Sequence, residues 1–220
     1  MPLFIFILAV LALTILPSFW VQAVIKRYRE PANRYARTGG QTARHLLDTL
    51  GLRNVVAEVT DGGDHYDPLA KAVRLTKDNF YGRSLTAVTI AAHEVGHAIQ
   101  HQKAYTPFRL RSAMWPAVSF ASNAWLILLM IGLFAQIAGL MTFAVVLYAV
   151  VVLFQLVTLP VEFDASRRAM SQLKELGLVT TGESQGARKV LTAAAMTYVA
   201  AALAALSQLA YWLIVINNRG

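Results

Sequence analysis

Residues 112–161 read SAMWPAVSFASNAWLILLMIGLFAQIAGLMTFAVVLYAVVVLFQLVTLPV, a stretch without a single Asp, Glu, Lys or Arg. A helix needs about 20 apolar residues to cross the hydrocarbon core of a bilayer, so this stretch is long enough for two spans. Gln136 and Gly139 lie near its centre, where polarity and a flexible backbone favour a tight turn. The sequence therefore predicts a transmembrane helical hairpin over residues 112–161.

Two further segments, residues 1–25 and 190–218, also lack charged side chains. Each is long enough for one span. The whole chain is 56% hydrophobic and 15% charged, whereas soluble domains average roughly 45–50% apolar and about 25% charged residues. We therefore expect a mainly α-helical membrane protein with about four transmembrane helices. The first segment lacks the basic start and small-residue cleavage site of a signal peptide, so we interpret it as a retained anchor.

The charged residues, Arg219 apart, lie in residues 26–111 and 162–189. A net charge of +8 could indicate a nucleic-acid partner, but basic residues also gather on the cytoplasmic side of membrane proteins. Since these two segments hold nearly all the Lys and Arg, we predict no nucleic-acid partner. We expect an integral plasma (inner) membrane protein with spans at 1–25, 112–161 and 190–220, its N-terminus outside and both charged segments in the cytoplasm.

Residues 26–111 have the pattern of a small α+β domain. A helical repeat follows Gly39 and ends before Gly51, a typical C-terminal glycine. Residues 55–60 and 72–76 are rich in β-branched side chains, and we predict that they pair as a hairpin. Ser84 is the predicted N-cap of the next helix, which has apolar residues at three- and four-residue spacing.

Residues 162–189 are predicted to contain a short helix between two spans. Pro160 stands where a span should end and can open a new helix, which Gly177 would stop after residues 161–175. Thr180 and Glu183 have the spacing of a capping box and predict the start of the last helix.

The chemistry of the sequence lies in His93-Glu94-Val95-Gly96-His97, an H-E-x-x-H pattern. On a helix the two histidines share one face and can bind a single zinc ion. Glu94 points about 100° away from His93, so it is placed to act on a water molecule as a general base. Alternatively, both histidines are core residues paired with carboxylates. A buried Glu94 without a neighbouring cation favours the metal site. The chain has no cysteine, so a transition metal must be held by His, Asp or Glu.

A catalytic zinc ion usually has three protein ligands, so a third residue is required. His101 continues the i+4 series, but it lies about 12 Å along the helix axis from His93, too far to share one ion. Glu162 is the better candidate, because its segment returns to the same side of the membrane. It could also be an ordinary first-turn acid favoured by the helix dipole.

Other polar residues near Glu162 have different expected roles. Ser166 continues the face of Glu162 and is a candidate to support a metal ligand through a hydrogen bond. Asp164 points about 200° away, and we expect it to pair with Arg167 or Arg168 on a solvated face.

Three segments carry a resemblance to a known family: AAHEVGHAIQH at 91–101, DHYDP at 64–68 and PVEFDASRRA at 160–169. Together they resemble the YugP-like family of neutral zinc metallopeptidases, over nearly the whole chain. The resemblance implies a membrane-anchored gluzincin with a zincin-like domain, in which His93, His97 and Glu162 bind zinc and Glu94 is the base. HtpX-like heat-shock proteases and CAAX-processing proteases are more distantly similar; they have an acid four residues after the third ligand, where this chain has Ser166.

These observations predict a zinc-dependent metalloendopeptidase whose substrates are peptides or proteins. His65, Tyr66 and Tyr81 are candidate donors to the oxyanion of the transition state. A strand edge near residues 71–76 could bind an extended substrate by strand addition.

Two alternatives belong to other classes. One is a non-proteolytic zinc-binding scaffold, whose helices bind a membrane-protein partner or a second copy of the chain. The other is an intramembrane protease of the site-2 type, in which the motif helix would itself be a span. Arg83 and Lys103 bracket that helix and argue against the second alternative.

Overall fold

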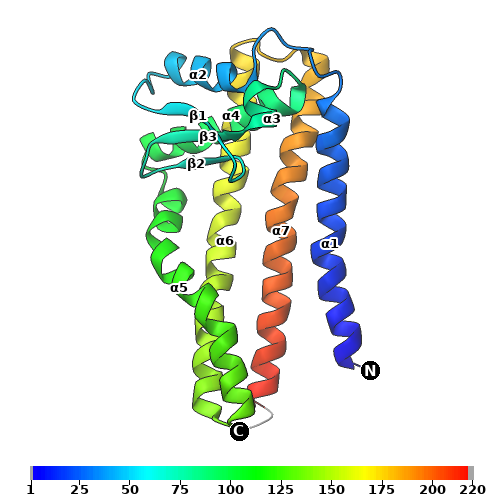
Figure 1. Cartoon of the computed structure of the whole chain (residues 1–220), viewed down its shortest axis with the longest axis vertical. Coiled ribbons are helices and arrows are strands. Elements are labelled where there is room, and N and C mark those ends of the chain that lie inside the picture. The colour runs from blue at the N-terminus through cyan, green and yellow to red at the C-terminus, as the bar shows by residue number, and fades with distance from the viewer. Residues whose placement is uncertain (1, 218–220) are drawn as a thin grey trace.

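The computed structural model describes residues 2–217, without some side chains near the N-terminus, so residue 1 and residues 218–220 of the predicted end segments lie outside the described residues. Its elements are α1 (Pro2–Arg29), α2 (Gly39–Thr49), β1 (Val56–Thr60), β2 (His65–Asp67), β3 (Ala72–Thr76), α3 (Lys77–Tyr81), α4 (Leu85–Gln102), α5 (Thr106–Phe134), α6 (Ala138–Glu175) and α7 (Thr181–Asn217). Helices α1, α5, α6 and α7 run along the long axis, and the sheet with α2, α3 and α4 lies at one end (Figure 1).

Within the described chain, α5, α6 and α7 are the three helices long and apolar enough to cross a membrane. Helix α1 has 28 residues and lies beside α7, but its role as the fourth span remains a prediction. The segment between α1 and α5 lies at the same end of the bundle as the junction of α6 with α7 (Figure 1). The two charged segments of the sequence therefore share one end of the molecule.

The predicted turn of the hairpin is confirmed, because α5 ends at Phe134, α6 begins at Ala138 and Gln136 has a φ of 55°. The predicted helix start at Pro160 is wrong. Helix α6 continues through Pro160 to Glu175, so a span and the charged helix are one element. A proline inside a helix removes one backbone hydrogen bond, and packing on both sides of it can hold the helix together. Gly177, with a φ of 61°, follows the helix end as predicted.

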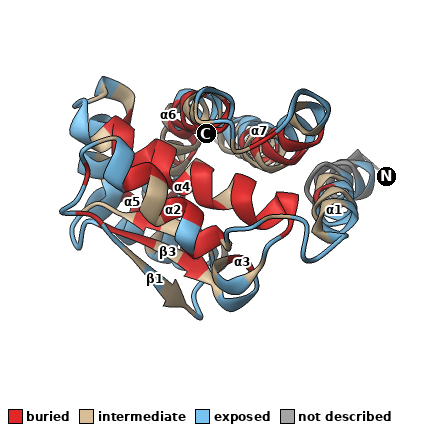
Figure 2. Cartoon of the chain, turned by 90° about the horizontal axis from the view of Figure 1, so that it is seen from above, coloured by how far each residue is buried: buried red, intermediate tan, exposed pale blue. Residues whose placement is uncertain are grey.

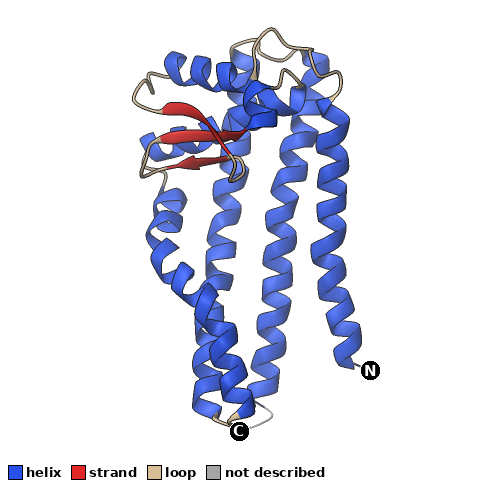
Figure 3. Ribbon diagram, in the orientation of Figure 1, coloured by secondary structure: helices blue, strands red, loops and turns tan. Residues whose placement is uncertain are grey.

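The sheet differs from the predicted hairpin. Its strand order is β1-β3-β2, with β1 parallel to β3 and β2 antiparallel to it (Figure 3). The short strand β2 occupies the second edge of β3 and has no counterpart in the prediction, because three residues are too few to show an alternating pattern. Residues 72–76 therefore form the central strand, and the expected substrate-binding edge near 71–76 is wrong.

Helix α4 is the centre of the small domain. It is buried among α2, the sheet and α6 (Figure 2). The predicted caps are confirmed: Ser84 Oγ accepts a hydrogen bond from the Ala87 amide, and Thr180 and Glu183 form a reciprocal pair. These contacts fix where α4 and α7 begin, and α4 carries the H-E-x-x-H residues into the interior.

Candidate metal centre

The position of the site depends on a close contact between α4 and α6. A Cβ atom on Gly96 would lie 2.6 Å from the carbonyl oxygen of Ala165, so the two backbones touch at this point. Small residues at the contact, Gly96 on α4 and Ala165 on α6, make this approach sterically possible. Glu162 lies three residues before Ala165, and the contact carries its carboxylate to the histidines of α4.

Three ligand atoms converge beside this contact. Nε2 of His93 lies 3.2 Å from Oε2 of Glu162, and Nε2 of His97 lies 3.6 Å from the same oxygen. Ligands about 2.0–2.1 Å from a tetrahedral zinc ion are roughly 3.3–3.5 Å apart. The donor set of two imidazoles and one carboxylate suits zinc, and its atoms lie within 4.8 Å of one another. His93, His97 and Glu162 can therefore hold a metal ion with little movement.

The second nitrogen of each histidine has its own partner. Nδ1 of His97 lies 3.0 Å from Oε1 of Gln100, and Nδ1 of His93 lies 3.3 Å from the hydroxyl of Ser166. When Nδ1 carries the proton and donates to such a partner, Nε2 keeps its lone pair for a metal. The structure thus places Ser166 where the sequence suggested, beside a candidate ligand.

Gln100 connects His97 to α6. Its side-chain amide donates to the carbonyl of Val161 at 2.8 Å and to Oδ2 of Asp164 at 2.9 Å. Asp164 also accepts hydrogen bonds from Arg167 and Arg168, so the predicted pairing is confirmed. Its predicted solvated position is wrong, because Asp164 is buried against α4.

Glu94 is buried beside the three candidate ligands. It lines one cavity together with His97 and Glu162. Within the described part of the chain, its carboxylate has no hydrogen-bond or ion-pair partner. Burial raises the pKa of Glu94 to about 7, and the nearby charge of Glu162 acts in the same direction. A carboxyl group with a pKa near neutrality can both accept and release a proton.

Two residues near the triad were not predicted from the sequence. The guanidinium of Arg111 on α5 lies 3.1 Å from Oε1 of Glu162. The histidines contact the other oxygen of this carboxylate, Oε2. Tyr198 of α7 lines the same cavity as Glu162. Arg111 is the last charged residue before an apolar span, where an arginine can reach the membrane surface without a partner, so its position did not indicate a contact with Glu162. Tyr198 had no local signal, because only the packing of α7 brings it to the site.

A cavity of about 600 Å³ opens onto Glu94 and onto two of the candidate ligands, His97 and Glu162. Residues 64–69, which include strand β2 with His65 and Tyr66, line one side, and apolar residues of α5 and α6 line the other. Two of the proposed oxyanion donors, His65 and Tyr66, therefore face the site. The third, Tyr81, is exposed, contacts Phe80 and does not line this cavity, so its proposed role is wrong.

His101 is not part of the metal centre, in agreement with its distance along the helix. Its Nδ1 lies 2.8 Å from the hydroxyl of Tyr66, and its ring stacks on Phe108. Burial raises the pKa of Tyr66 to about 12, so this hydroxyl stays protonated at neutral pH. The Tyr66–His101 contact ties β2 to the end of α4.

The family described as "Putative neutral zinc metallopeptidase" matches residues 3–217. The chain belongs to this family. The chain is also 42% identical, over 98% of its own length and 97% of the relative's, to the "Putative membrane protease YugP" of Bacillus subtilis (strain 168). No solved structure matches the chain. The resemblance inferred from the motifs is thus confirmed, and membership of the family agrees with a donor set suited to zinc.

Proposed function

We propose that this protein is a membrane-anchored zinc metalloendopeptidase of the gluzincin type. His93, His97 and Glu162 would hold the zinc ion, and Glu94 would be the general base. The proposal rests on one observation above the rest: ligand atoms from two helices distant in sequence converge at separations that suit tetrahedral zinc. The name of the family supports the same conclusion.

The chemistry divides between the ion and the side chains of the chain. When bound, zinc supplies a Lewis acid that activates water and polarises the peptide carbonyl. Glu94, which lines the same cavity as Glu162, takes a proton from the attacking water and delivers it to the departing amine. Its freedom from other hydrogen bonds leaves both carboxylate oxygens available for this transfer.

Arg111 and Tyr198 are the best placed donors for the charge that develops on the carbonyl oxygen. Both line the cavity together with Glu162, and Arg111 is paired with the Glu162 carboxylate. Fixed donors aimed at a developing oxyanion lower the barrier because they need not reorganise during the reaction. We therefore assign this role to them, whereas the hydroxyl of Tyr66 lies 2.8 Å from Nδ1 of His101 and links β2 to α4.

The cavity favours an extended peptide as substrate. Strand β2 is an edge of the sheet and contributes its residues to the cavity wall. A peptide chain could add to this edge through main-chain hydrogen bonds, which would give weak sequence preference. Trp115 and Phe154 on the opposite wall belong to α5 and α6, so the substrate would bind close to the membrane surface.

The topology proposed from the basic residues places this site in the cytoplasm. Positive charges gathered in residues 26–111 and 162–189 support that orientation, with the N-terminus outside. The intramembrane alternative loses support, because α4 is not among the apolar helices of the described chain that could span a membrane.

Zinc content and peptide hydrolysis, measured together on the full chain in detergent, test the proposal. Glu94→Gln should keep zinc and lose hydrolysis of casein, whereas Glu162→Ala should lose most of its zinc. Glu175→Gln, an exposed acid at the end of α6, is the matched control and should change neither. A Glu162→Ala variant that keeps full zinc and activity would refute the ligand assignment. A zinc-loaded wild-type protein without hydrolysis would favour the scaffold alternative.

A further inference from the structure

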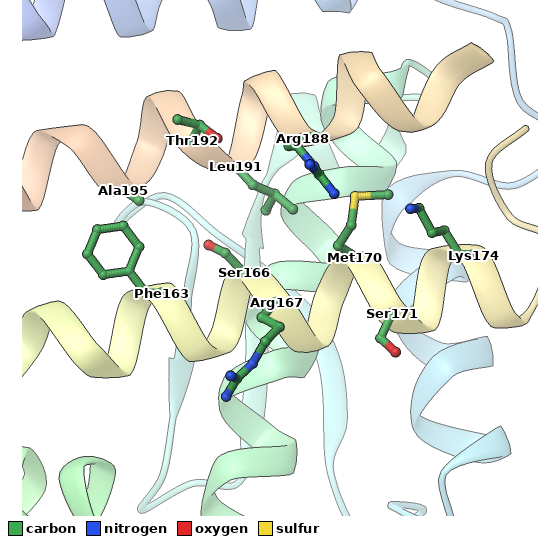
Figure 4. A pocket seen from close by; sticks show the side chains of 10 residues that line it. All are labelled: Phe163, Ser166, Arg167, Met170, Ser171, Lys174, Arg188, Leu191, Thr192 and Ala195. Atoms are coloured by element: carbon green, nitrogen blue, oxygen red, sulfur yellow. The ribbon is translucent and has the colours of Figure 1, made fainter. Parts of the chain in front are cut away.

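A second hollow of about 500 Å³ lies between α6 and α7, separate from the cavity at the metal centre. Figure 4 shows that Lys174 of α6 and Arg188 of α7 reach toward the space between the two helices. Arg167 also borders this groove, but its side chain extends to the other side of α6 (Figure 4). We call this hollow the α6–α7 groove.

The groove carries uncompensated positive charge. Its lining includes three basic side chains and no acid. Lys174 and Arg188 are exposed and form no ion pair with any residue that the structure describes. Arg167 is paired with Asp164, but that carboxylate also neutralises Arg168. The basic end of the groove is therefore suited to an anion.

The opposite end of the groove is apolar. Phe163 and Ala195 lie at the end away from Lys174 (Figure 4), and Phe163 is 46% exposed. Leu191 and Ala195 belong to the charge-free segment that begins at residue 190. Along its length, the groove thus passes from the charged part of the helices into the part expected in the hydrocarbon core.

Hydroxyl groups lie between these two ends. Thr192 lines the groove from α7, whereas the hydroxyl of Ser171 extends to the side of α6 away from α7 and donates to Glu175 (Figure 4). Hydroxyls can donate to phosphate oxygens, while Lys and Arg side chains bring charge to the same group. Ser166 also lines the groove, and its hydroxyl is the one that lies 3.3 Å from Nδ1 of His93. A molecule in the groove would therefore lie one side chain away from the candidate metal centre.

We propose that the α6–α7 groove binds an anionic phospholipid. Lys174 and Arg188 hold the phosphate of the headgroup, and an acyl chain follows Phe163 and Leu191 into the membrane. Charge complementarity argues for this occupant, because basic pockets between transmembrane helices favour anionic headgroups at the membrane surface. The change from basic to apolar lining matches the change from headgroup to acyl chain. The inference depends on membrane insertion of α6 and α7 and is independent of peptidase activity.

Lipid binding to the full-length protein in neutral detergent tests this proposal. Native mass spectrometry would compare phosphatidylglycerol with phosphatidylcholine of identical acyl chains. We expect phosphatidylglycerol to bind at least tenfold more tightly. The double variant Lys174→Gln/Arg188→Gln should weaken phosphatidylglycerol binding about tenfold and leave phosphatidylcholine binding unchanged. Thr192→Trp, which fills the groove without changing its charge, should weaken binding of both lipids.

The control removes two positive charges elsewhere. Lys71→Gln/Lys189→Gln changes two exposed lysines that do not line the groove, one of them adjacent to Arg188 in the sequence. It should bind phosphatidylglycerol as the wild type does. Equal binding of the two lipids, unchanged binding in the Lys174/Arg188 variant, or an equal loss in the control would overturn the proposal. So would inorganic phosphate that displaces the lipid at equimolar concentration, since the site would then recognise free phosphate.

Discussion

Oε1 of Gln100 lies 3.0 Å from Nδ1 of His97, on the next turn of the same helix. The amide nitrogen of Gln100 donates to α6, so its oxygen must be the atom that faces the imidazole. The oxygen accepts a hydrogen bond from Nδ1–H, so Nε2, which faces Glu162, carries no proton in the neutral imidazole. This contact prepares His97 to bind a metal before any ion arrives.

Replacing Gln100 with Ala should therefore weaken zinc binding while the fold is retained. Loss of a hydrogen-bond partner behind a metal ligand typically costs about 10–100-fold in affinity. Competition with a chelator, followed by zinc content, would measure the effect on the purified protein. Gln102→Ala removes an exposed amide from the same helix and should leave the affinity unchanged. Equal affinities for Gln100→Ala and the wild type would contradict the positioning role.

The contact between Gly96 and Ala165 gives a prediction about stability. A methyl group at position 96 would meet the Ala165 carbonyl at 2.6 Å, so α4 and α6 must separate. Gly96→Ala should destabilise the protein by about 1–3 kcal/mol, as overpacked cores do. It should also lower zinc content, because Glu162 moves away from the histidines. Gly139→Ala adds a methyl group with nothing within 4 Å and should have little effect on thermal unfolding.

The long helices and the metal motif could be predicted because their signals are local. A charge-free segment of spanning length, or two histidines four residues apart, is visible in the sequence without knowledge of any partner. The assignment of Glu162 used one further step: the topology returns its segment to the end of the molecule that carries the motif. Packing of Gly96 on Ala165 then follows from the small residues on both helices.

The remaining features depend on contacts that no local pattern contains. Strand β2 is defined by its antiparallel pairing with β3, in which Tyr66 lies opposite Val73. Tyr198 reaches the site because α7 packs along α6. The neighbouring residues are mostly alanines, and they do not indicate which side of α7 faces the metal centre. Gln100 could have been suspected, since a polar residue three positions after a histidine shares its helix face. The predicted helix start at Pro160 is wrong because packing of α6 against its neighbours lets the helix continue through the proline.

Low pH should destabilise the fold around β2, because the carboxylate of Asp67 becomes protonated. Its carboxylate accepts hydrogen bonds from the amides of Ala70 and Leu69 and pairs with Arg74, and these contacts lower its pKa, with the Ala70 amide the largest cause. A lowered pKa in the folded state stabilises the fold above the unfolded-state pKa of about 3.9. That contribution is lost as the pH falls through the folded-state value.

Asp67→Asn should therefore unfold at a lower temperature than the wild type at pH 7, and the difference should shrink below about pH 4. Thermal unfolding in detergent across this range would measure it. Asp61→Asn removes a highly exposed partner of Lys77 and should shift the midpoint little at either pH. A difference between Asp67→Asn and the wild type that stays constant with pH would contradict the assignment.

Tyr198 provides the most specific test of the proposed transition-state donors. Its hydroxyl approaches the metal centre from α7, while the three ligands come from α4 and α6. Tyr198→Phe removes this single oxygen and leaves all three ligands in place. We expect zinc content and KM to be unchanged and kcat to fall by roughly 10²–10³, the usual cost of one oxyanion donor.

Tyr81→Phe is the matched control for this substitution. Tyr81 is exposed on α3 and does not line the cavity, so loss of its hydroxyl should leave kcat, KM and zinc content at wild-type values. A Tyr198→Phe variant that lost zinc would show that the hydroxyl acts on Glu162 and not on the substrate. Wild-type kcat in Tyr198→Phe would transfer the donor role to Arg111, whose guanidinium lies on the same carboxylate. The KM and kcat values together distinguish these outcomes, because a donor that acts only in the transition state changes kcat alone.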